Sequence, residues 1–106
     1  MAAETLRVPA LTQSQQRSVC QVLDRVIPDA EVWVFGSRAT GRSRPFSDLD
    51  LLVTRPDRLS WAQRAALRDG FEASELPFLV DVVESQGLGP SVASRIDAER
   101  LPLRQI

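Results

Sequence analysis

Apolar residues recur along the chain with two different periods, which divide it into alternating helices and strands. The first stripe has the spacing of one helical face, and Thr12 followed three residues later by Gln15 forms a capping-box pattern in front of it. This pattern predicts a helix from about Ser14 to Val26 that stops before Pro28. The apolar face consists of Val19, Val22, Leu23, Val26 and Ile27.

Three other runs have the β-branched, aromatic or alternating composition of strands. They are residues 31–35, residues 48–54, where apolar and acidic residues alternate, and residues 78–84. Residues 36–47 lie between the first two runs and are rich in glycine, arginine and hydroxyl residues. That composition favours a functional loop or a short helical turn over a core element.

Two further helices are expected in the second half of the chain. Ser60 can cap one of them, whose partial apolar stripe is interrupted by Gly70. The other is expected at residues 91–99, where Val92 and Ile96 would point inward.

The ends of the chain carry less pattern than its middle. Residues 1–10 predict a flexible N-terminal arm, residues 101–106 a tail, and residues 11–106 a single domain. The order of elements predicts an α/β (α+β) fold, with a three- to four-stranded mixed sheet and helices packed mainly on one face.

Composition narrows the chemistry that the protein can perform. The chain of 106 residues has no histidine and a single cysteine, Cys20, which excludes an internal disulfide and a cysteine-based zinc site. The net charge of −1 lacks the basic excess of a general nucleic-acid binder, so direct nucleic-acid binding is not expected. No signal peptide follows Met1 and no apolar run reaches the ~20 residues of a membrane span, so we expect a soluble, cytoplasmic protein without membrane contact.

Three carboxylates stand out against this background. Asp48 and Asp50 lie two residues apart in an expected strand, so both side chains share one face. Asp81 interrupts an apolar strand, where an ionised carboxylate needs a compensating charge, either a bound cation or an arginine. Carboxylates on adjacent strands suit Mg²⁺, and two such ions can activate an attacking hydroxyl and stabilise a leaving pyrophosphate.

A candidate phosphate site directly follows the first strand. Gly36 permits a tight turn with close backbone approach, and the Ser37 hydroxyl can donate to a phosphate oxygen. Arg38, Arg42 and Arg44 follow in the loop, where at least one could neutralise a triphosphate, the alternative being solvated loop charges.

Together these residues resemble a known signature. Gly36-Ser37, ten intervening residues and Asp48-Leu-Asp50 are similar to the pattern of the nucleotidyltransferase superfamily that includes DNA polymerase β and kanamycin nucleotidyltransferase. The fuller stretches, residues 34–41 and 47–53, resemble the minimal nucleotidyltransferases found as antitoxins beside HEPN-domain toxins.

The resemblance implies specific roles. Asp48, Asp50 and Asp81 would be the catalytic, metal-binding residues for two Mg²⁺ ions, or Mn²⁺ in their place. The nucleotide would contact four residues, Gly36, Ser37, Arg38 and Ser47. The implied activity is transfer of AMP from ATP to a hydroxyl, with a tyrosine of a HEPN-type toxin as acceptor and antitoxin action as the result.

Two other functions stay open at this stage. A catalytically silent antitoxin could neutralise its partner by stoichiometric binding, because no second domain is present to hold an acceptor. Transfer to a small molecule would need a pocket that homodimerisation could supply. The sequence is compatible with a homo-oligomer or a hetero-oligomer.

Overall fold

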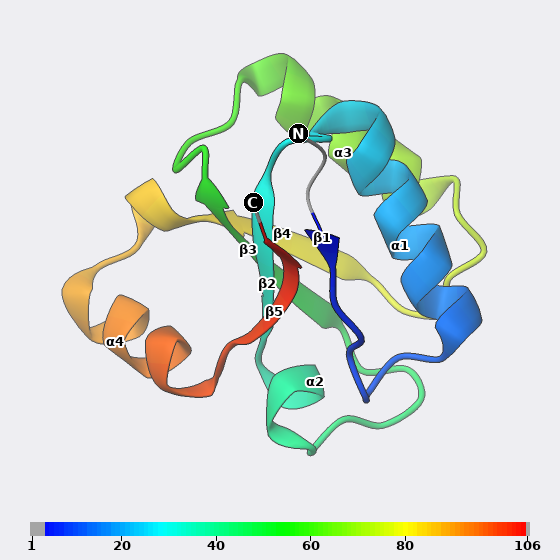
Figure 1. Ribbon diagram of the computed structural model, residues 1–106, viewed down its shortest axis with the longest axis horizontal. Helices are drawn as coiled ribbons and strands as arrows, with labels where there is room; N and C mark the ends of the chain where they lie inside the picture. The colour runs from blue at the N-terminus through cyan, green and yellow to red at the C-terminus, as the bar shows by residue number, and fades with distance from the viewer. Residues whose placement is uncertain (1–3, 106) are drawn as a thin grey trace.

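The computed structural model of the chain describes residues 4–105, and within them five strands form one mixed sheet. The strands are β1 (Glu4–Thr5), β2 (Glu31–Phe35), β3 (Leu49–Arg55), β4 (Val80–Glu84) and β5 (Leu101–Gln105). They lie in the order β1-β5-β2-β3-β4, and only β3 and β4 are parallel to each other (Figure 1). The sheet therefore has β4 at one edge, while β5, the last strand of the described residues, lies in its interior.

Two of the helix starts follow the capping signals in the sequence. The helices are α1 (Gln13–Val26), α2 (Ser37–Thr40), α3 (Trp61–Glu72) and α4 (Pro90–Glu99), and a 3₁₀ turn spans Ser85–Gly87. Thr12 accepts from the amide of Gln15 at 3.0 Å, and Ser60 accepts from that of Gln63 at the same distance. In both boxes the glutamine side chain reaches back to the cap amide, which satisfies two otherwise unpaired donors.

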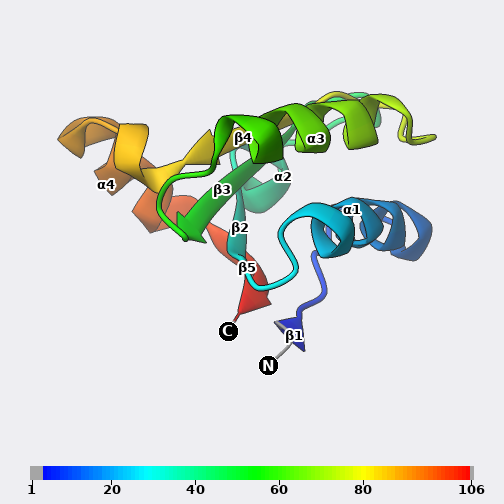
Figure 2. The same cartoon turned by 90° about the horizontal axis from the view of Figure 1, so that it is seen from above.

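The main core lies between the sheet and the pair α1 and α3. Alternate residues of β2 and β3 face this core, among them Val32, Val34 and Leu51, which have no exposed surface. Gly70 allows the two helices to approach, since a Cβ there would lie 2.8 Å from a methyl group of Val22. Seen from above, α1 and α3 lie on one side of the sheet and α4 on the other (Figure 2). Because its neighbours Leu49 and Leu51 belong to this core, the alternation of the strand places Asp50 on the opposite face of the sheet.

Most predicted elements are confirmed, and the α+β class with them. The expected tail is instead β5, in which Leu103 is fully buried, and Pro102 hides the strand pattern. Of the two residues expected inward on α4, Ile96 is buried but Val92 is 38% exposed. The predicted arm lies partly outside the described residues, and its described part contains β1, paired with β5.

One arginine fastens the loop between α2 and β3. Arg38 is 4% exposed, and its guanidinium donates to the carbonyl oxygens of Ser47 at 2.9 Å, Ala10 at 2.9 Å and Pro45 at 3.2 Å. It also stacks 4.1 Å from the ring centre of Phe78. Burial lowers the pKa of this guanidinium from its usual value, although carbonyl dipoles and the aromatic face offset the cost of a buried cation.

No helix among residues 4–105 has the length and apolar character needed to cross a bilayer.

Replacing Arg38 should therefore unfold the loop rather than remove a surface charge. We expect Arg38→Ala to lower the free energy of unfolding by about 2–4 kcal/mol, because the partly buried carbonyls of Ser47 and Ala10 lose their donor. Urea denaturation monitored by circular dichroism measures this. The control Arg42→Ala, in the exposed part of the same loop, should change it by less than about 0.5 kcal/mol. Equal midpoints for the two variants would contradict the assigned role.

Candidate active site

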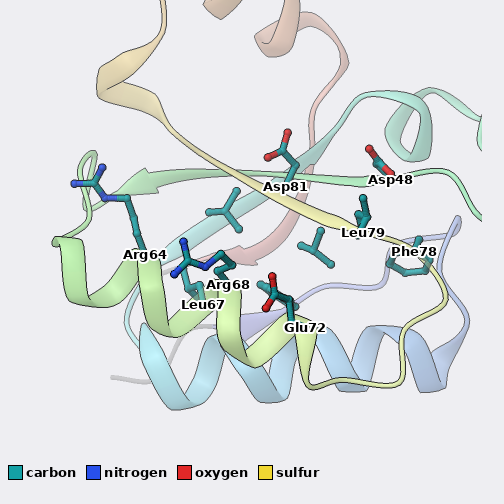
Figure 3. A pocket seen from close by; sticks show the side chains of 11 residues that line it. Asp48, Arg64, Leu67, Arg68, Glu72, Phe78, Leu79 and Asp81 are labelled. Carbon is teal, nitrogen blue, oxygen red and sulfur yellow. The ribbon is translucent and has the colours of Figure 1, made fainter.

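The register between β3 and β4 brings two of the predicted carboxylates together. Asp50 and Asp81 are direct partners in this parallel pair, so both project from the same face of neighbouring strands. Asp48 lies two residues before Asp50, and the amide of Leu49 between them donates to the carbonyl of Leu79 at 2.9 Å. In Figure 3 the side chains of Asp48 and Asp81 point away from α3.

Asp50 lies in an electrostatically unfavourable position. Burial raises the pKa of its carboxyl above the usual value, and the neighbouring charges of Asp81, Asp48 and Glu99 raise it further. None of the three aspartates forms an ion pair with an arginine within the described residues. The site thus collects negative charge without a protein cation to balance it, which is the arrangement that a bound divalent cation would relieve.

The three carboxylates lie too far apart to share one metal ion in this conformation. Across residues 4–105, no three acidic, histidine or cysteine side chains stand close enough together to hold an ion as they are. Asp48 and Asp81 are exposed, however, and only Asp50 is partly buried. Exposed side chains can change rotamer at low cost, so the donor set fits a hard cation that draws Asp48 and Asp81 toward Asp50.

Gly36 forms the turn beside these carboxylates. Its φ of 73° lies in the region that favours glycine, and its carbonyl accepts from the amides of Ala39 at 3.0 Å and Thr40 at 3.2 Å to start α2. A Cβ at this position would collide with Oδ2 of Asp50. The predicted phosphate turn and the predicted metal ligands therefore touch each other, and Ser37 opens the helical turn next to them.

The other two predicted nucleotide contacts have different surroundings. The guanidinium of Arg38 is directed at the backbone carbonyls described above, so the structure gives this residue a role in holding the loop instead of a free donor for phosphate. The hydroxyl of Ser47 accepts from the amide of Arg44 at 2.8 Å and shapes the same loop. Both residues support the position of Asp48 through the backbone.

Sequence reasoning missed one residue of the site. Glu99, the last residue of α4, accepts a hydrogen bond from the amide of Gly36 at 3.1 Å. It was expected only within the last helix, and no local signal connects it to a turn 63 residues earlier. Pairing of β5 with β2, which the sequence did not predict, is what brings it there.

A groove adjoins the carboxylates at the edge of the sheet. It has a volume of about 550 Å³ and lies between α3 and β4 (Figure 3). Its floor is apolar, with Leu67, Phe71 and Val82, and Asp48 and Asp81 stand on its rim. The carboxylates of Asp48 and Asp81 point away from α3 (Figure 3), so they border the groove without being directed into it.

Gly36 allows a test of the contact between the turn and Asp50. We expect Gly36→Ala to destabilise the protein by about 1–3 kcal/mol, because it adds a clash with Asp50 to an unfavourable φ. Gly41→Ala is the matched control, since Gly41 has a φ of 79° and nothing within 4 Å of an added Cβ. Thermal unfolding of both variants measures the difference. An equal loss of stability in both would show that the clash contributes nothing.

The raised pKa of Asp50 predicts how stability depends on pH. A carboxyl whose pKa is higher in the folded state binds its proton more tightly there, so stability falls as pH rises above the unfolded value. In metal-free buffer we expect Asp50→Asn to raise Tm by about 2–4 °C at pH 7 and to have little effect near pH 4. Asp29→Asn, at the other end of β2, is the control. A variant less stable than wild type at pH 7 would contradict the prediction.

Comparisons with known proteins agree with this geometry. The family model for the nucleotidyltransferase domain matches residues 16–103. The chain is 38% identical over 63 residues to "Probable protein adenylyltransferase MntA" of Haemophilus influenzae, an alignment covering 59% of this chain and 55% of that protein. The chain thus spans about half the length of this curated relative.

Solved structures share the fold. A minimal nucleotidyltransferase superposes with a TM-score of 0.64 and 32% identity, covering 86% of this chain and 91% of that chain. A toxin–antitoxin complex crystallised with AMP-PNP contains a chain with a TM-score of 0.69 and 24% identity, covering 86% of this chain and 73% of that one. The family match extends over most of the sequence and includes the turn and all three carboxylates. This chain belongs to the nucleotidyltransferase domain family.

Proposed function

We propose that this protein transfers AMP from ATP to a hydroxyl of a partner protein, a tyrosine of a HEPN-type toxin, and thereby acts as an antitoxin. The observation that carries the proposal is the placement of Asp50 beside Asp81 and against the Gly36 turn. The adenylyltransferase name of the Haemophilus influenzae relative and the toxin–antitoxin complex solved with AMP-PNP support the choice of nucleotide and of partner.

Each part of the site has a task in this reaction. Asp48, Asp50 and Asp81 would hold two divalent cations, Mg²⁺ or Mn²⁺, which when bound activate the attacking hydroxyl and stabilise the leaving pyrophosphate. The turn at Gly36 and Ser37 would bind the triphosphate through its backbone and hydroxyl. The acceptor hydroxyl would approach from the side toward which the carboxylates of Asp48 and Asp81 point (Figure 3).

The proposed reaction is a single displacement at the α-phosphorus of ATP. The acceptor oxygen forms a bond to the α-phosphorus of ATP, and the bond from that phosphorus to the bridging oxygen of the β-phosphate breaks. Pyrophosphate leaves with that electron pair, and the acceptor proton passes to the exposed carboxylate of Asp81. Asp81 is exposed, so it can pass the proton on to solvent.

The carboxylates give the decisive variant. We expect the double variant Asp48→Asn, Asp50→Asn to lower transfer by ~10²-fold or more, since it removes ligands from cations that supply several kcal/mol of transition-state stabilisation. The measurement is transfer of label from α-³²P ATP, with Mg²⁺, to the small protein that co-purifies with this one. Label from γ-³²P ATP should stay off the partner, which separates nucleotidyl from phosphoryl transfer.

Controls decide between enzyme and stoichiometric antitoxin. Asp29→Asn, which removes an exposed carboxylate far from the site, should transfer AMP as the wild type does. If the double variant keeps full transfer, the proposed site is wrong. If it loses transfer but still protects cells from the toxin at equal expression, neutralisation proceeds by binding and not by adenylylation.

A further inference from the structure

The amide of Gly36 is satisfied by a side chain from a distant part of the chain. In the antiparallel pair of β2 and β5, Val34 lies opposite Leu101, so the register places Gly36 opposite Glu99. Glu99 already belongs to α4, so β5 has no strand carbonyl to offer at that position. Its carboxylate oxygen takes the place of the missing carbonyl and accepts from Gly36 at 3.1 Å.

Glu99 is held at this position from both sides. Ile96, one turn earlier in α4, is 1% exposed, and its carbonyl accepts from the amide of Arg100 at 2.8 Å. The guanidinium of Arg100 stacks 4.0 Å from the ring centre of Trp33 in β2 and pairs with Asp97 at 3.3 Å. The junction of α4 and β5 is thus anchored to the strand that ends at Gly36, which limits how far the Glu99 side chain can move.

Gly36 therefore lies between two carboxylates that act on it differently. Asp50 packs against its Cα from the side of β3, and Glu99 accepts its amide from the side of β5. A glycine in this conformation has more backbone freedom than any other residue, so the turn needs external contacts to keep one geometry. The hydrogen bond to Glu99 is such a contact, and it sets where Ser37 and α2 begin.

We propose that Glu99 is a positioning residue for nucleotidyl transfer, which fixes the Gly36–Ser37 turn against Asp50 by accepting the Gly36 amide. This inference rests on the proposed function. The role needs an acceptor oxygen and not a negative charge, so glutamine can fill it and alanine cannot.

Steady-state kinetics test the role in catalysis. Glu99→Ala should lower kcat/KM for ATP by about 10-fold, the effect of one lost hydrogen bond at a turn that binds substrate, with KM for the acceptor protein unchanged. Glu99→Gln should stay within about 3-fold of wild type. Arg95→Ala, an exposed change on the same helix, should have no effect. Equal loss in Glu99→Gln and Glu99→Ala would overturn the proposal, as would unchanged kinetics in Glu99→Ala.

Amide exchange of the free protein tests the hydrogen bond without substrate. In ¹⁵N-labelled protein the Gly36 amide should exchange with solvent about 10-fold faster in Glu99→Ala than in wild type or Glu99→Gln, while amides of α1 keep their rates. Unchanged Gly36 exchange would overturn the proposal even if activity fell. A wild-type protein that transfers no nucleotide would instead sink the proposed function, and the exchange rates would still decide whether Glu99 holds the turn.

Discussion

Hydrogen bonding between β3 and β4 fixes Asp50 next to Asp81, and neither backbone can move away while the strands remain paired. The two carboxylates repel each other, and partial burial of Asp50 adds a desolvation cost that shows in its raised pKa. Natural proteins keep such an arrangement where it serves function, since packing alone would favour an apolar residue at the partly buried position of Asp50. The pair therefore gathers negative charge at one edge of the sheet, which a bound divalent cation would relieve.

The rest of the site is connected to this pair of aspartates through direct contacts and hydrogen bonds. Gly36 touches Asp50 directly, so the end of β2 cannot shift without moving the carboxylate. The ten residues from Arg38 to Ser47 must return the chain to Asp48, and Arg38 secures that return by binding the carbonyl of Ser47 from inside the loop. The Gly36 turn and the proposed metal ligands are thus connected through short contacts, and the buried guanidinium of Arg38 holds the loop between them.

What the sequence predicted well is what local chemistry determines. The starts of α1 and α3 follow from Thr12 and Ser60, whose partners lie three residues away, and β3 follows from alternation within seven residues. The shared face of Asp48 and Asp50 needs only the strand period.

The misses all depend on distant partners. β5 contains Pro102 and is a strand because β2 lies beside it, a fact that no window of sequence contains. The sequence offers Arg38 as a contact to phosphate, and the carbonyls that its guanidinium binds are brought together only in the folded loop. The contact of Glu99 with Gly36 has no sequence signal for the same reason, since the two residues lie 63 positions apart and meet only when β5 pairs with β2.

The interior position of β5 has a consequence for biosynthesis. β2 pairs with β3 on one side and with β5 on the other, so a growing chain can form the first pair early but must wait for residues 101–105 to complete the sheet. Until then the β5 side of β2 is an open edge, of the kind that invites association with other chains or binding by chaperones. Because Glu99 lies two residues before β5, its contact with Gly36 also forms late, and a ribosome-bound fragment that ends before residue 99 would contain all three aspartates without this contact.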